Sequence, residues 1–351
     1  MIPLKAKKTN HSRFRYSKKQ LRAPIAFLFL AIYACIVYAN ATPSQPILPT
    51  HDLPIHLYSN QVTGNLQKTF KEAILNAKES IVCIIYALTD DEIITALRKK
   101  AEEGLSVLIV HDPVATQNIA FRLGPKVQVK SLKHKGLMHN KLISIDHKQA
   151  WIGSANLTRD SLLLHANLVM GIESAEVALA IEQKAQETRF HPFKHPLQIQ
   201  TEQQKLEIWF LPDAPQALDR LLTLLNTAKK SIKVAMFTFT HPKLIQALVD
   251  AHKREVKVQV ILDYDSSRQT SSHAFQRFKR EKMDVLVSQR TGLLHEKIAI
   301  IDDTSLVAGS TNWTKAAFTA NDETLCILSD LSQEQQAKLS HFWTTTLQEA
   351  K

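Results

Sequence analysis

The second half of this chain repeats its first half. The segment Ala77–Ile81 resembles Ala228–Ile232 at an offset of 151 residues, and the same offset aligns Asp112 with Asp263. Further along, the offset grows to 156 residues, so the second copy carries five extra residues in the intervening loop. A repeat of this length indicates two structural units of about 150 residues that fold alike.

Each copy alternates short apolar runs with segments of helical periodicity. The runs IVCIIYAL and IKVAMFTF are typical of buried strands, and LSVLIVHD and VKVQVILD of further strands that end in an acid. Between them we expect crossover helices at Glu92–Glu103 and Lys243–Arg254. This alternation predicts an α/β fold, with two similar lobes whose mixed sheets are flanked by helices.

The start of the chain differs in composition from the repeated body. Residues 1–23 hold eight Lys and Arg residues and no acid, and fifteen apolar residues follow at Ile25–Ala39. With Ala39-Asn40-Ala41 behind them, residues 1–41 are predicted to be a cleaved signal peptide or an uncleaved membrane anchor. Either alternative places the body outside the cytoplasm, as a periplasmic, secreted or membrane-anchored protein.

A linker and two lobes are expected after this leader. Residues 42–55 contain four prolines and no periodicity, which predicts an extended linker. We expect the first lobe at residues 56–198 and the second at 205–351. Of the net charge of +11, eight charges belong to the leader, which leaves +3 on the rest of the chain. Global charge therefore identifies no substrate.

The strongest local pattern is His-x-Lys-x-x-x-x-Asp, which occurs once in each copy. In both copies the His precedes a Gly-Ser-x-Asn segment, and the Asn stands seventeen positions after the His. One such match is weak, but two matches in register with the duplication are strong. The pattern is formed by His139, Lys141, Asp146, Ser154 and Asn156, and again by His295, Lys297, Asp302, Ser310 and Asn312.

Strand geometry divides these candidate catalytic residues into two groups. Side chains alternate along a strand, so His139 and Lys141 share one face while Asp146 falls on the other, and the second copy behaves alike. We expect Asp146 and Asp302 to fix the strand or its turn. The two Lys ammonium groups, with Ser154, Asn156, Ser310 and Asn312, would then bind a phosphate.

This doubled motif resembles the signature of the phospholipase D superfamily, and the resemblance covers roughly residues 60–330. It implies an active site at the pseudo-twofold interface of the lobes. One histidine would attack phosphorus and form a phosphohistidine, while the other would protonate the leaving oxygen and then activate water or an alcohol. No metal and no cofactor is implied, because imidazole serves as nucleophile or acid and base near neutral pH.

The resemblance also assigns the two histidines. Family members often carry an acid eleven residues after the asparagine, where it orients the histidine of the opposite lobe. Glu323 holds that position in the second copy, but Asn167 holds it in the first, which is a departure. A carboxylate stabilises positive charge on an imidazole, whereas an amide can only orient it. We therefore predict His139 as the nucleophile and His295 as the general acid.

The substrate remains open at this point. The leader favours a phospholipase D that hydrolyses phospholipid head groups beside a membrane surface. An exported endonuclease acting on DNA or RNA is favoured by a likeness to small single-motif nucleases and by the basic residues of the stretch 267–280. A phosphatidyltransferase of the cardiolipin synthase type and a binding protein with a relic site are further alternatives. No obligate protein partner is expected.

Most other polar and aromatic residues are expected to have structural roles rather than catalytic ones. Asp112 and Asp263, at strand ends, are expected to be structural, and Cys83 and Cys326 to be buried free thiols. Trp313 would either line the substrate entrance or pack in the core. Isolated histidines are expected to lie at the surface or in satisfied core positions, namely His134, His147, His165, His241, His252 and His273.

Overall fold

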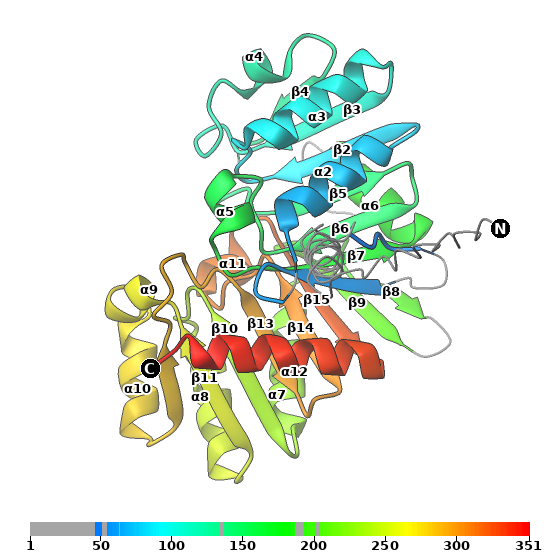
Figure 1. Ribbon diagram of the computed structural model, residues 1–351. Coiled ribbons are helices and arrows are strands. Elements are labelled where there is room, and N and C mark those ends of the chain that lie inside the picture. The colour runs from blue at the N-terminus through cyan, green and yellow to red at the C-terminus, as the bar shows by residue number, and fades with distance from the viewer. Residues whose placement is uncertain (1–45, 51–54, 63, 134–135, 187–192, 201–203) are drawn as a thin grey trace, which may run out of the picture. The chain divides into compact units, whose positions relative to one another are not determined.

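The computed structural model describes residues 46–50, 55–62, 64–133, 136–186, 193–200 and 204–351. The predicted leader, most of the predicted linker and His134 lie outside these residues. Two mixed sheets form the described body, one above the other in Figure 1. Among the described residues no helix combines the length and the apolar character that a membrane crossing needs.

The first sheet has seven strands in the order β1-β7-β6-β5-β2-β3-β4. Strands β2, β3 and β4 are parallel to one another, and the other neighbours are antiparallel. The strands are β1 (Ile55–Ser59), β2 (Ser80–Ile85), β3 (Ser106–His111), β4 (Gln128–Ser131), β5 (Lys141–Ile145), β6 (Gln149–Gly153) and β7 (Leu168–Glu173). The helices of this half are α2 (Leu66–Asn76), α3 (Asp91–Glu102), α4 (Ile119–Leu123), α5 (Arg159–Leu163) and α6 (Ala175–Gln186).

The second sheet repeats this plan with eight strands in the order β12-β11-β10-β13-β14-β15-β9-β8. Its strands are β8 (Leu197–Gln200), β9 (Lys205–Leu211), β10 (Ser231–Met236), β11 (Lys257–Leu262), β12 (Asp284–Val287), β13 (Lys297–Ile301), β14 (Ser305–Gly309) and β15 (Glu323–Ser329). Its helices are α7 (Ala217–Thr227), α8 (Pro242–Lys253), α9 (Tyr264–Arg268), α10 (Ser272–Arg280), α11 (Lys315–Thr319) and α12 (Gln333–Gln348). The mixed α/β class expected from the sequence is confirmed. Strand β8 already belongs to the second sheet, so the chain enters that sheet before residue 205.

Local sequence explains where the helices begin and end. Asp90 caps α3 by accepting a hydrogen bond from the Ile93 amide at 3.0 Å, and acids occupy its first turn. The chain then turns at Gly104, whose φ of +99° suits glycine. Helix α12 begins with a capping box between Ser332 and Gln335.

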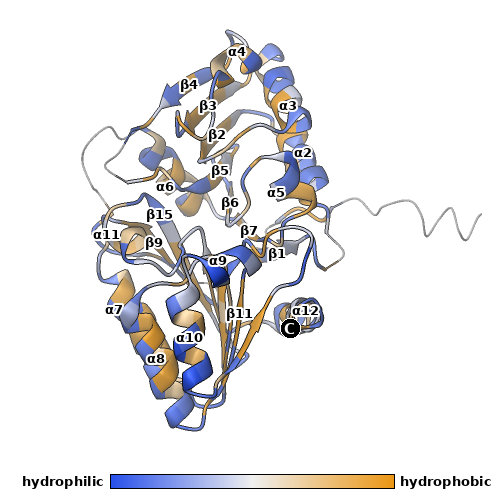
Figure 2. Cartoon of the chain, turned by 90° about the vertical axis from the view of Figure 1, so that its left-hand side faces the viewer, coloured by the Kyte–Doolittle hydropathy of each residue, from blue (hydrophilic) through white to orange (hydrophobic). Residues whose placement is uncertain are grey.

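The apolar core is shared between the two halves. One cluster joins side chains of both sheets, among them Ile152 and Met170 with Phe210 and Ile300. Two further clusters lie on the outer sides, beneath α2 and α3 in one half and beneath α7 and α8 in the other. Figure 2 shows hydrophobic residues along α7 and α8, and the buried side chains of both helices belong to the second of these clusters. Because the central cluster draws on both sheets, burial of apolar surface holds the halves together.

Candidate active site

Each motif histidine is tied by its backbone to the opposite half. The amide of His139 donates to the carbonyl of Asp322 at 2.9 Å, and the amide of His295 donates to the carbonyl of Ala166 at 2.9 Å. Two residues later each motif lysine begins a central strand, β5 or β13. The two histidines therefore lie at the junction of the halves, where the sequence resemblance expected them.

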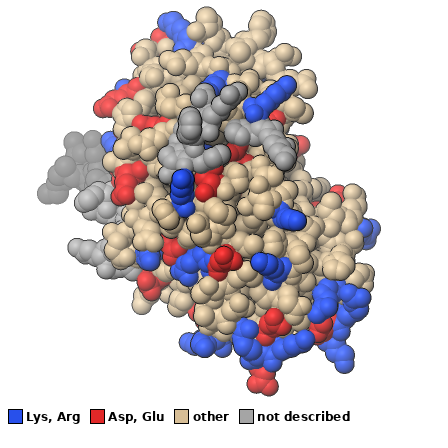
Figure 3. Space-filling model, turned by 180° about the vertical axis from the view of Figure 1, so that it is seen from behind, with Lys and Arg blue, Asp and Glu red and all other residues tan. Residues whose placement is uncertain are grey.

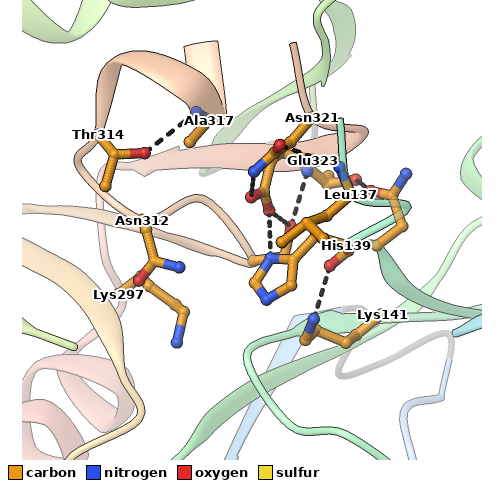
Figure 4. A network of polar contacts seen from close by, with 12 residues as sticks. Leu137, His139, Lys141, Lys297, Asn312, Thr314, Ala317, Asn321 and Glu323 are labelled. Carbon is orange, nitrogen blue, oxygen red and sulfur yellow. Dashed lines mark hydrogen bonds and ion pairs between the residues drawn. The ribbon is translucent and has the colours of Figure 1, made fainter. Parts of the chain in front are cut away.

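A buried carboxylate orients His139. The Nδ1 atom of His139 lies 2.8 Å from Oε2 of Glu323, at the start of β15 in the other half (Figure 4). Ser310 donates to the same oxygen at 2.5 Å, and Asn321 donates to Oε1 at 3.4 Å. Glu323 is fully buried, so the carboxylate has one fixed orientation.

An amide takes the corresponding place beside His295. Nδ1 of His295 lies 3.1 Å from Oδ1 of Asn167, which also accepts the Ser154 hydroxyl at 2.8 Å. The Asn167 amide nitrogen donates to the Ser161 carbonyl at 2.9 Å. Because the amide oxygen is an acceptor, this network assigns the proton to Nδ1 of His295. The neutral ring of His295 therefore presents a bare Nε2 atom.

The two serines do not act as the sequence predicted. Ser154 and Ser310 were expected to donate to a phosphate, but each hydroxyl proton is directed to the residue that orients a histidine. The Ser154 hydroxyl oxygen also accepts the Leu168 amide at 3.1 Å, and the Ser310 hydroxyl oxygen accepts the Thr324 amide at 3.0 Å. The serines thus hold Asn167 and Glu323 in place.

Each motif lysine lies over an aromatic ring that the motif itself does not include. Nζ of Lys141 donates to the His139 carbonyl at 2.6 Å and lies 5.1 Å from the ring centroid of Tyr86. Nζ of Lys297 donates to the His295 carbonyl at 2.5 Å, and its distance to the Phe237 ring centroid is 4.9 Å.

These two aromatic rings also contact the histidines. The Tyr86 and His139 ring centroids are 5.1 Å apart, and those of Phe237 and His295 are 4.9 Å apart. Both aromatic residues directly follow a buried strand and are separated by the repeat offset of 151 residues, which was the available signal.

Burial shapes the electrostatics of the site. It lowers the pKa of His139, an effect that the Glu323 carboxylate opposes. It lowers the pKa of His295 well below the ordinary value, and Lys297 and Lys141 add to this effect. Burial also lowers the pKa of Lys141 to about 7 and that of Lys297 well below its usual range. A bound anion would stabilise the protonated forms of these buried lysines and histidines.

The aspartates of the motif lie at the far end of the strands and are not part of the site. Asp146 follows β5 and accepts the backbone amides of Lys78, Glu79 and Ser80 at 2.7–3.1 Å. Asp302 follows β13 and accepts the equivalent amides of the second copy, from residues 229, 230 and 231. Their candidate catalytic assignment is wrong, and the scaffolding role expected from strand alternation is the one observed.

One asparagine of the motif, Asn312, lies beside Lys297 (Figure 4). Asn312 accepts the Thr238 amide through Oδ1 at 3.2 Å, which leaves its NH₂ group to face the site. In Figure 4 the Asn312 amide and the Lys297 ammonium point into the same space as the His139 ring. The buried Oδ1 atom of Asn156 has no hydrogen-bond partner among the described residues.

Other residues keep the structural roles expected of them. Asp112 accepts the Val114 and Ala115 amides, and Asp263 accepts the Ser266 and Leu294 amides. Cys83 and Cys326 are buried free thiols, as predicted.

Trp313 packs in the core. It is 1% exposed and lies against the Phe239 ring, with 5.0 Å between ring centroids. The alternative in which it lines a substrate entrance is therefore wrong.

The basic stretch at 267–280 lies in α9 and α10. Figure 3 shows Lys and Arg side chains gathered at the lower end of the molecule, where Figure 1 places α8 and α10. Arg277 pairs with Glu281 at 2.9 Å, and Arg268 stacks on Tyr264. Across the described part of the chain, no group of three or more His, Cys, Asp or Glu side chains is arranged to hold a metal ion.

Comparisons with known proteins all point to the phospholipase D-like family. A family model described as "Cardiolipin synthase, PLD-like domain" matches residues 70–189 and again residues 221–343, once in each copy. The mitochondrial cardiolipin hydrolase of Xenopus laevis is 34% identical over 135 residues, which are 38% of this chain and 64% of that protein. A phospholipase D of Rickettsia bellii is 31% identical over 106 residues, which are 30% of this chain and 52% of that protein.

A solved structure extends the likeness in fold to nearly the whole chain. The phosphatidylserine synthase of Haemophilus influenzae superposes with a TM-score of 0.65, covering 89% of this chain and 90% of that one at 15% identity. At that identity the likeness concerns the fold alone.

Proposed function

Because this chain belongs to the phospholipase D-like family, we propose that it hydrolyses head-group phosphodiester bonds of phospholipids through a phosphohistidine intermediate. The observation that carries the proposal is the pair of buried histidines at one junction, each oriented through Nδ1 by a side chain of the other half. This arrangement leaves both Nε2 atoms for a substrate between them.

The proposed reaction has two steps. In the first, Nε2 of His139 attacks phosphorus, the bond to the leaving oxygen breaks, and His295, which enters this step in its protonated form, donates its Nε2 proton to that oxygen. Glu323 stabilises the positive charge that develops on the His139 ring. In the second step His295 takes a proton from water, the resulting hydroxide oxygen attacks phosphorus, and the bond to His139 breaks. Proton and charge balance over the two steps.

The phosphate would be held by the groups that surround the histidines. Lys141 and Lys297 supply the positive charge, and their pKa values are lowered chiefly by burial, so a bound anion stabilises their protonated forms. The amides of Asn156 and Asn312 would complete the contacts. A lipid substrate is favoured by the named activities of the relatives, a cardiolipin hydrolase and a phospholipase D.

The test uses the full chain with EDTA present. Phosphatidylcholine, cardiolipin, and single- and double-stranded nucleic acids are each incubated with the protein, and the released products are measured. We expect release of head group from phospholipid, which is lost in His139→Ala and His295→Ala. His273→Asn serves as the matched control, since His273 is exposed on α10. Cleavage of nucleic acid alone would replace the lipid proposal by a nuclease, and loss of activity in EDTA would remove the phosphohistidine mechanism.

Product analysis separates hydrolysis from transfer. With a short-chain alcohol in the assay, a hydrolase releases phosphatidic acid, whereas a phosphatidyltransferase forms the ester of the added alcohol. We expect phosphatidic acid as the main product, because the second step uses water.

We propose that the body acts outside the cytoplasm, or on a membrane face, on the strength of the leader at residues 1–41. Cell fractionation of the full chain tests this. Recovery of the whole protein in the cytosolic fraction would contradict it.

A further inference from the structure

A third histidine lies beside the site, at a position where the two copies differ. The ring centroids of His165 and His295 are 6.1 Å apart. The residue His165 is partly exposed, and neither ring nitrogen has a hydrogen-bond partner among the described residues. Its backbone amide is bound to the Asp160 carbonyl at 2.9 Å, so the loop that carries it is held.

We propose that His165 is a positioning residue that acts through His295, by passing protons between solvent and the Nε2 atom of His295. This inference rests on the proposed function, because it concerns protonation of the leaving oxygen. A separation of 6.1 Å between ring centroids is one that a single water molecule can bridge.

The need for such a relay follows from the hydrogen bonds of His295. Asn167 accepts the Nδ1 proton, so a neutral His295 has no proton on Nε2 and cannot act as an acid. It must first gain a proton at Nε2. His295 leaves the second step of the proposed reaction protonated, but its buried surroundings and the neighbouring Lys297 and Lys141 keep its pKa well below the ordinary value. At neutral pH the resting ring therefore gives this proton up and has to regain one before the next first step. In the relay His165 gives its proton through water to His295 and recovers one from solvent.

The residue of the second copy that is equivalent to His165 has a different role. Asn321 occupies that position, where its Oδ1 accepts the Leu137 amide at 3.1 Å and its NH₂ group donates to Glu323 at 3.4 Å. It thereby supports the carboxylate behind His139. At this pair of equivalent positions, the titratable side chain lies beside the amide-backed histidine, which is the one that needs a proton.

The charges around His165 are mixed. Burial is the main cause that lowers its pKa; Asp160 and Asp263 oppose this effect, while Lys297 and Arg290 add to it. The pKa of His165 is thus lowered, and the two carboxylates limit that effect.

The test compares two leaving groups in the first turnover. An alkyl phosphodiester needs a proton on its leaving oxygen, whereas a p-nitrophenyl phosphodiester does not. His165→Phe keeps a ring against His295 but carries no proton. We expect its rate of first-turnover cleavage to fall at least about tenfold with the alkyl substrate and to stay within about twofold with the p-nitrophenyl substrate.

A second variant and a control complete the design. His165→Ala should show the same selectivity, and added imidazole should restore the alkyl rate. His273→Asn should match the wild type on both substrates. Equal losses on both substrates, or no loss on either, would overturn the relay while leaving the proposed function standing. If the wild type cleaves neither substrate, the proposed function itself fails and the relay with it.

Discussion

The Nδ1 atom of His139 lies 2.8 Å from the Oε2 atom of Glu323, a residue 184 positions away in the other half of the chain. The corresponding partner of His295 is an amide, at 3.1 Å. The site therefore has near-twofold geometry but unequal charge. A carboxylate favours positive charge on His139, as a phosphohistidine requires, and this inequality is the basis of the first two predictions.

The two histidines should behave differently when each is removed. His295→Ala lacks the group that activates water, so a p-nitrophenyl phosphodiester should leave a stable phosphorylated His139. Mass spectrometry after rapid denaturation at alkaline pH should locate the phosphoryl group. His139→Ala should trap nothing, and trapping there instead would reverse the assignment.

Glu323→Gln tests charge separately from orientation. A glutamine oxygen can still accept from His139, as Asn167 does from His295, but it carries no charge. We expect kcat to fall by about 10²–10⁴-fold with the thermal unfolding temperature little changed. Asn167→Gln, which alters the other pair without removing a charge, is the comparison. Similar kcat losses in both variants would show that orientation, rather than charge, matters at Glu323.

Binding of an anion should weaken as the pH rises through neutrality. Burial lowers the pKa of Lys141 to about 7, so the free site loses the Lys141 charge above that pH. The affinity for a phosphonate monoester, which keeps one negative charge throughout, should fall as the pH increases from 6 to about 8.5, by at most about tenfold per pH unit. Calorimetric titration measures this affinity. Lys141→Gln should bind weakly with a flatter profile, and a flat wild-type profile would contradict the prediction.

Asp302→Asn should destabilise the fold without altering the chemistry. The carboxylate accepts three backbone amides, and we expect the free energy of unfolding to fall by about 1–3 kcal/mol. Asp303→Asn is the matched control. Its neighbouring ion pair with Lys233 is exposed, so its loss should cost less than about 1 kcal/mol.

The difference in unfolding free energy between the wild type and Asp302→Asn should depend on pH with a definite sign. Burial tends to raise the pKa of Asp302, but its hydrogen bonds to the amides of Lys229, Ser231 and Lys230 outweigh burial and lower it. A carboxyl with a lowered pKa in the folded state stabilises the protein above its unfolded pKa of about 3.9 and loses that contribution as the pH falls through the folded value. Denaturant titrations should therefore show the largest gap between wild type and Asp302→Asn near neutral pH. A gap that is unchanged at pH 3 would contradict this account.

Much of the fold and part of the site could be predicted from the sequence. The repeat predicted two mixed sheets, and strand alternation correctly separated His139 and Lys141 from Asp146. The pairing of Glu323 with His139 followed from a family resemblance and a fixed spacing. The first two features are repeated or local in the sequence, so a single chain reveals them, whereas the third joins residues 184 positions apart and came from the resemblance.

The missed features depend on contacts between distant segments. Ser154 and Ser310 looked like phosphate donors because no sequence pattern shows that their protons are already directed to Asn167 and Glu323. His165 appeared ordinary because its neighbour His295 is 130 residues away. Tyr86 and Phe237 were detectable, since both directly follow a buried strand at the repeat offset.

The exchange of backbone hydrogen bonds between the halves, from His139 to Asp322 and from His295 to Ala166, has an evolutionary consequence. Two identical subunits that built such a site would share one gene, so a substitution behind one histidine would appear behind both. Joining the copies in one chain removes that constraint. Each half can then accumulate its own changes, and the different roles of Glu323 and Asn167 are a specialisation that the fused arrangement permits.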